Sequence, residues 1–82
     1  MTELETKVLI VIGELGGLEP GRPVVPDDVM KQLKIDKAEF GLVEDELERR
    51  DFIEECGIDK LTLTKGGVAY LATVHQAAAP LK

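Results

Sequence analysis

The sequence has almost none of the residues that build disulfide bonds or metal centres. Among its 82 residues, Cys56 is the single cysteine and His75 the single histidine. One cysteine cannot form an internal disulfide, and a metal site usually needs several cysteine or histidine ligands at close spacing. We therefore expect no disulfide, no metal and no cofactor. Cys56 is expected to pack within a hairpin, with an exposed reactive thiol as the alternative, and His75 to lie at a helix edge.

Long apolar runs and catalytic loops are also missing. The longest run, "VLIVI" at 8–12, is flanked by charges and far shorter than the roughly 18 residues of a membrane helix. The start "MTELETK" lacks the basic stretch and cleavage site of a secretory signal. "GELGG" at 13–17 lacks the Lys-Ser/Thr ending of a phosphate-binding loop. These features predict a cytoplasmic protein that is not an enzyme and does not contact membranes.

Positive charge is scarce, and the excess of negative charge is concentrated in one segment. The chain has 16 acidic and 10 basic residues, for a net charge of −6. Residues 36–51 contain seven of these acids but only three bases, and so hold four of the six surplus negative charges. Because carboxylates repel the phosphate backbone, this balance argues mildly against nucleic acid as a partner.

The first half of the chain predicts two helices joined by a loop. Thr2 and Glu5 have capping-box spacing, and a helix over 2–15 would bury one stripe, formed by Leu4, Val8, Val11, Ile12 and Leu15. The β-branched content of "VLIVI" leaves a strand as the alternative. Glycines and prolines at 16–26 predict a loop with a short extended piece at Val24 and Val25. Pro26 suits the first turn of a second helix, which ends near Lys34.

The second half predicts a helix, a hairpin and a closing helix. Asp36 and Glu39 have capping-box spacing at the start of a third helix, whose core stripe is Phe40, Val43 and Leu47. Alternating residues around a turn at 57–60 predict two short strands. Thr64 can cap a last helix, in which Val68, Leu71 and Ala72 face inward.

Two stretches carry a resemblance to a known family. "LERRDFI" (47–53) is similar to the "L-E-x-x-G-L-I" pattern, and "LTLTKGGVAYL" (61–71) to the "L-T-x-x-G-x-x-x-L" pattern, of winged helix-turn-helix proteins. Asp51 replaces the usual glycine, but aspartate tolerates a left-handed backbone better than most residues. The resemblance implies an α+β fold: a three-helix core, a two-stranded β-hairpin wing and a closing C-terminal helix. We expect one domain over 1–79 and a flexible tail at 80–82.

In that family the third helix enters the major groove, where its outward side chains meet base edges. At about 100° per residue, the side opposite the core stripe carries Ala38, Leu42, Asp45 and Arg49, flanked by Gly41, Glu46 and Glu48. Lys37 is the one base in the first turn. This set is poor in hydrogen-bond donors for bases, and the other lysines, including Lys31 and Lys34, look scattered along the chain.

The favoured interpretation is therefore an interaction module rather than a DNA reader. A partner protein would bind an apolar spot with an acidic rim on the third helix, formed by Ala38, Gly41, Leu42, Asp45 and Arg49. A homodimer through Ile10, Tyr70 and Val74 on the terminal helices is a second possibility. The alternative is a small transcription regulator that binds duplex DNA, disfavoured by charge, through Lys37, Lys60, Lys65 and Arg22.

Overall fold

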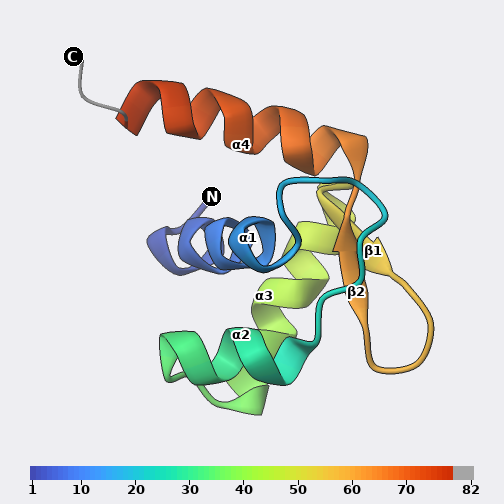
Figure 1. The fold of residues 1–82 in the computed structure, drawn as a ribbon. Coiled ribbons are helices and arrows are strands. Elements are labelled where there is room, and N and C mark those ends of the chain that lie inside the picture. Colours follow the sequence, from blue (N-terminus) through green and yellow to red (C-terminus); the bar gives the residue numbers. More distant parts are fainter. Residues whose placement is uncertain (79–82) are drawn as a thin grey trace.

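Four helices and a two-stranded antiparallel hairpin make up the computed structural model, which describes residues 1–78 and the side chains of 1–74 (Figure 1). The elements are α1 (Glu3–Leu15), α2 (Pro26–Leu33), α3 (Lys37–Arg49), β1 (Ile53–Glu55), β2 (Leu61–Leu63) and α4 (Lys65–Ala78). This order confirms the predicted winged helix-turn-helix fold. The predicted tail at 80–82 and the predicted surroundings of the His75 side chain lie outside the described residues.

Helix α1 is the centre of the packing, and it buries more than the single stripe that the sequence predicted. Its capping box forms as expected, with the Glu5 N–H donating to the Thr2 hydroxyl at 3.1 Å and the Thr2 N–H to the Glu5 carboxylate at 2.9 Å. Leu9, outside the predicted stripe, is fully buried, because α2, α3, α4 and β2 all pack against α1. The prediction for Leu15 was wrong: it is 42% exposed, since α1 ends there, beyond the core.

The loop after α1 adds a third extended segment to the hairpin. Val24 exchanges two backbone hydrogen bonds with Leu61, at 2.7 and 3.0 Å, and so confirms the predicted extended piece. Strand β2 thus lies between Val24 on one edge and β1 on the other, where Ile53 pairs with Leu63. This pairing holds the loop against the wing and brings Pro26 to the first position of α2.

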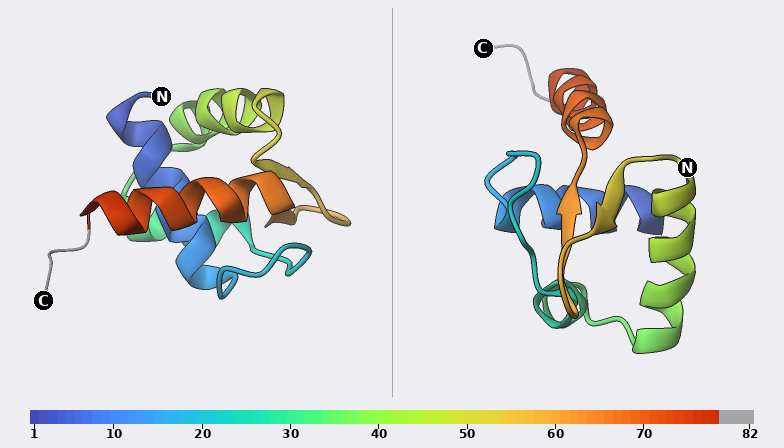
Figure 2. Two further views of the ribbon diagram at one scale, coloured as in Figure 1. Left: turned by 90° about the horizontal axis from the view of Figure 1, so that it is seen from above. Right: turned by 90° about the vertical axis from the view of Figure 1, so that its right-hand side faces the viewer.

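The turn between α2 and α3 depends on one left-handed residue and one side-chain cap. Lys34 has φ of 57°, which reverses the chain after α2, and the Ile35 N–H then donates to the Met30 carbonyl at 3.2 Å. The Asp36 carboxylate accepts from the Glu39 N–H at 2.8 Å, which is one half of the predicted capping box. As a result α3 lies crosswise to α1 at one edge of the molecule (Figure 2). Phe40, on α3, faces the core as predicted.

The corner between α3 and the wing is joined directly to the start of α4. Asp51 has φ of 62°, the left-handed conformation expected there. The Thr64 hydroxyl donates to the Asp51 carbonyl at 2.5 Å and accepts from the Gly67 N–H at 3.0 Å, while the Thr64 N–H donates to the Phe52 carbonyl at 3.0 Å. Any Cβ at Gly67 would collide with the Phe52 carbonyl oxygen. The absence of a side chain at Gly67 is therefore what lets α4 begin against this corner.

The face of α4 that meets the core is narrower than predicted. Leu71 is fully buried, and the ring of Tyr70 stacks on Phe52 with ring centroids 4.8 Å apart. The prediction that Ala72 faces inward was wrong, because it is exposed. Figure 1 shows α4 above α1, with its far end extending beyond the rest of the fold, and the left view of Figure 2 shows that the two helices cross.

Substituting Gly67 tests the corner. We expect Gly67→Ala to lower the free energy of unfolding by about 1–3 kcal/mol, the usual cost of forcing an atom into a packed site. Gly41→Ala is the matched control, because a Cβ there meets nothing within 4 Å. Because Gly41 lies in mid-helix, Gly41→Ala should raise the free energy of unfolding, by up to about 1 kcal/mol. Thermal unfolding followed by circular dichroism compares the two; equal unfolding temperatures would contradict the role given to Gly67.

Candidate functional site

The outward face of α3, which we call the α3 face, consists of Ala38, Gly41, Leu42 and Asp45. Ala38, Leu42 and Asp45 are exposed as predicted. Leu42 is 75% exposed; among the described residues Ile58, in the wing turn, is a more exposed large aliphatic side chain, at 88%. Arg49, further along the same side, is also exposed. Because α3 forms one edge of the molecule, the described residues leave this face open for contact with another molecule (Figure 2).

The acidic rim expected around Leu42 is smaller than the helical projection suggested. The Glu46 carboxylate pairs with Arg50 at 2.8 Å and with Arg49 at 3.4 Å, and its side chain is only 24% exposed. Glu48 is half-buried, and its pKa is raised by this burial and by the carboxylate of Glu55 on β1, which is close enough to act on it. Of the three expected rim acids, Asp45 alone is exposed. Repulsion of phosphates by the α3 face is correspondingly weaker than predicted.

The structure also gathers lysines that looked scattered in the sequence. Lys31 of α2, Lys34 directly after α2 and Lys37 of α3 line one shallow pocket of about 460 Å³ at the helix turn, together with Asp27. We call these three the turn lysines. All three are exposed, and none takes part in the ion pairs formed among the described residues. Lysines that looked scattered along the chain therefore line one pocket, because the reversal at Lys34 brings the end of α2 and the start of α3 together.

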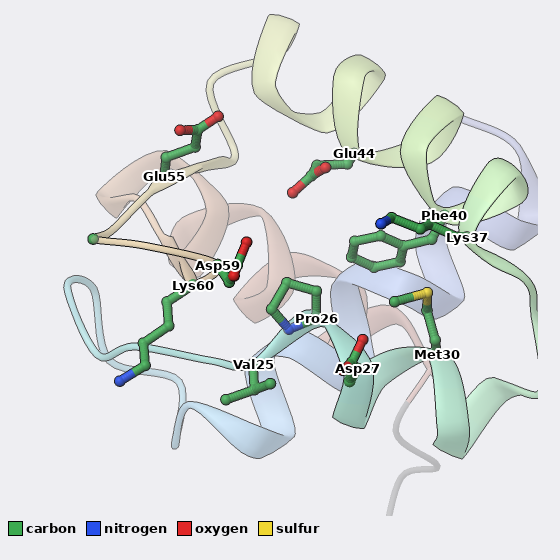
Figure 3. Close-up of a pocket in the computed structure, with 11 residues that line it drawn as sticks. Val25, Pro26, Asp27, Met30, Lys37, Phe40, Glu44, Glu55, Asp59 and Lys60 are labelled. Atoms are coloured by element: carbon green, nitrogen blue, oxygen red, sulfur yellow. The ribbon is translucent and has the colours of Figure 1, made fainter.

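A second pocket, of about 410 Å³, lies between α2, α3 and the wing, and it is acidic (Figure 3). Its charged lining comprises four carboxylates and two ammonium groups: Asp27, Glu44, Glu55 and Asp59 against Lys37 and Lys60. Figure 3 shows the Glu44 side chain projecting from α3 into this space, whereas Lys60 extends away from it. The arrangement leaves Glu44 without a close cationic partner among the described residues.

Two glutamates of α3 are less acidic than usual. Partial burial raises the pKa of Glu44 above its ordinary value of 4.5, and the carboxylates of Glu48, Asp45 and Glu55 raise it further. Partial burial likewise raises the pKa of Glu48, with Glu55 and Asp45 contributing. The inner side of α3 therefore carries a cluster of like charges that repel one another at neutral pH.

The remaining candidate residues fall in separate places. Lys60, exposed in the wing turn, shares the acidic pocket with Lys37. Lys65 is the exposed first residue of α4, and Arg22 pairs with Glu19 at 3.7 Å on the loop after α1; neither lines that pocket. Lys37 and Lys60 thus line the same pocket, and the other two residues lie elsewhere. Cys56 is half-buried beside the wing turn, where its N–H donates to the Lys60 carbonyl at 2.9 Å.

The residues predicted for a homodimer have partners within the chain. Ile10 and Tyr70 are half-buried and pack against the core, and Tyr70 also stacks on Phe52. Val74 is half-buried on α4. Their use as dimer contacts stays a prediction. Within residues 1–78, no group of acidic, histidine and cysteine side chains is placed to hold a metal ion, and no helix is long and apolar enough to cross a membrane.

The raised pKa of Glu44 has a consequence for stability. A carboxyl whose pKa is higher in the folded protein binds protons more readily there than in the unfolded chain, so its contribution to stability grows as the pH falls and is lost as the pH rises through the raised pKa. We expect Glu44→Gln to raise the unfolding temperature at pH 7, and this gain to shrink as the pH is lowered toward 4.5.

Unfolding temperatures measured from pH 7 down to about pH 4 check this prediction. Glu14→Gln, which removes the same charge from an exposed site on α1, serves as the control. If Glu44→Gln is no more stable than wild type at pH 7, the like-charge cluster is not a source of strain.

Comparison with known proteins finds likeness in structure and none in sequence. No family model matches the chain, and neither does any curated protein. The reduced form of MarR from E. coli matches with a TM-score of 0.82 and 24% identity, over 96% of this chain and 55% of that chain. A cysteine-to-serine mutant of MarR from E. coli, complexed with operator DNA, matches with a TM-score of 0.78 and 22% identity, over 96% and 56% of the two chains. The chain thus spans just over half the length of MarR and has the winged helix-turn-helix fold that the sequence predicted.

Proposed function

We propose that this chain is the DNA-binding module of a transcription regulator, with α3 entering the major groove. The likeness over 96% of the chain to MarR complexed with operator DNA supports this function over the interaction module favoured by charge alone. Among observations on the chain itself, the cluster of turn lysines carries the proposal. It places three unpaired ammonium groups beside the first turn of α3, the end of the helix that meets DNA in winged-helix readers.

The charges around α3 favour one way of docking on DNA. Lysines neutralise phosphates and release the counterions condensed on DNA, which drives binding at low salt. The turn lysines can do so beside the start of α3, and Lys60 can do so in the wing turn. The acidic pocket lies between them, and Glu46 is already neutralised by Arg49 and Arg50. Phosphates are therefore expected to contact the two lysine sites and to pass by the pocket.

A second candidate function, a module that binds a protein partner or a second copy of the chain, is favoured by one observation. Leu42 is 75% exposed and has Asp45 one turn away, so it forms an apolar spot beside a charge. Such an association would be insensitive to salt and would be abolished by Leu42→Asp, as size-exclusion chromatography with light scattering can show. Salt-insensitive association that survives Leu42→Asp would rule out this surface as the interface.

The turn lysines give the direct test of DNA binding. Fluorescence anisotropy with a labelled random-sequence duplex, from about 20 to 200 mM salt, should show affinity falling steeply with salt. The triple variant Lys31→Gln, Lys34→Gln, Lys37→Gln should bind at least tenfold more weakly at the lowest salt. Its log–log salt slope should be lower by roughly 0.9 for each phosphate that the variant no longer neutralises.

Lys7→Gln is the matched control, since it removes the same charge from a lysine on α1 that pairs with Glu3 at 3.2 Å. It should bind as wild type does. If no duplex binding is detected at the lowest salt, the proposed function is rejected. If Lys7→Gln weakens binding as much per lysine as the triple variant does, overall charge rather than the turn lysines is responsible.

A further inference from the structure

The α3 face offers almost nothing that can hydrogen-bond to a base. Ala38, Gly41 and Leu42 have no polar side-chain atoms, and Asp45 follows only one turn later. Winged-helix readers usually present donors such as arginine or asparagine at these positions. The feature of the major groove that an apolar side chain can recognise directly is the 5-methyl group of thymine. If α3 enters DNA, this face is suited to that methyl group.

Leu42 is placed to make such a contact. Its side chain is 75% exposed, although the chain buries thirteen other hydrophobic residues almost completely. No described residue covers it, so a molecule that meets the α3 face would remove its apolar surface from water. Burying one methyl group corresponds to about fourfold in affinity. A leucine against a thymine methyl would therefore give a measurable preference without any hydrogen bond.

Gly41 supplies a second, independent observation on the same face. It lies in the interior of α3, where alanine in place of glycine ordinarily favours a helix by about fivefold. A Cβ at this position would meet nothing within 4 Å. Packing within the chain therefore gives no reason for a glycine here. A glycine between Ala38 and Leu42 does allow another molecule to approach the helix backbone closely.

Asp45 indicates which part of DNA the face would meet. Its exposed carboxylate lies one turn beyond Leu42 and would repel the phosphate backbone. The turn lysines, which attract phosphates, lie at the other side of the α3 start, around Met30 and Ile35. The backbone would thus be held at the turn, while the α3 face meets the base edges in the groove.

We propose that α3 recognises thymine through its 5-methyl group, with Leu42 as the contact and Gly41 allowing the close approach. This inference rests on the proposed DNA-binding function and names what that same site would recognise. It predicts a site whose specificity depends on one or two methyl groups rather than on bidentate hydrogen bonds. The positioning contacts to phosphate remain with the turn lysines.

The experiment begins with selection of duplexes from a random library by the 82-residue chain at low salt. Each thymine of the enriched site is then replaced singly by uracil, which keeps the base pair and removes only the methyl group. At one or two positions, uracil should weaken binding by wild type about fourfold. Leu42→Ala should bind thymine and uracil equally at those positions, and the other thymines of the site serve as internal controls.

Gly41→Ala distinguishes an effect on DNA contact from an effect on folding. It should raise the unfolding temperature and yet weaken binding to the selected site, whereas a purely structural role would move both in the same direction. The triple lysine variant should weaken binding to thymine and uracil duplexes alike.

The outcomes distinguish this inference from the function on which it rests. Absence of any duplex binding at low salt overturns both. Binding without enrichment of a site, or an enriched site insensitive to uracil at every position, overturns thymine recognition and leaves DNA binding in place. Salt-insensitive protein association that Leu42→Asp abolishes, with no duplex binding, assigns the α3 face to a protein partner and overturns the inference.

Discussion

The corner where α3 meets the wing is the constraint on which the rest of the fold depends. At this point a left-handed Asp51 turns the chain, and the Thr64 hydroxyl bonds both to the Asp51 carbonyl and to the first turn of α4. Gly67 lets the closing helix approach the Phe52 carbonyl. Because the same few backbone groups join α3, the wing and α4, the position of the wing beside α3 follows from this contact. The acidic pocket and the spacing between Lys37 and Lys60 follow in turn.

Electrostatics divides the surface around α3 into distinct regions rather than one acidic face. The turn lysines gather on one side, the carboxylates of Glu44 and Glu55 line the pocket on the inner side, and the outward face is mostly uncharged apart from Asp45. The negative net charge, taken alone, suggests a protein that is repelled by polyanions. The distribution instead allows phosphates to be bound beside α3 while carboxylates face elsewhere, since opposite charges act over distances of about 10 Å at moderate salt.

The elements were predictable because their signals are local. Thr2, Asp36 and Thr64 each cap a helix through a residue three positions away, and Pro26 marks a helix start by its own backbone restriction. Burial was less predictable. A single apolar stripe describes the buried residues of a helix that packs on one side only. Several elements pack against α1, so Leu9, outside the stripe, is buried as well, whereas Leu15 is exposed because it lies at the end of the helix.

The sequence by itself determined the order of helices and strands, their caps and the outward position of Leu42, because these depend on residues within a few positions along the chain. Only the tertiary structure decided which charges share a surface. Lys31 of α2, Lys34 in the turn and Lys37 of α3 line one pocket because the turn reverses the chain, and Glu44 of α3 is close enough to Glu55 of the wing to be affected by its charge. The pairing of Glu46 with Arg49 and Arg50, by contrast, is local to α3. Interactions between charges on different elements depend on distance in space, and projection around a single helix cannot supply that distance.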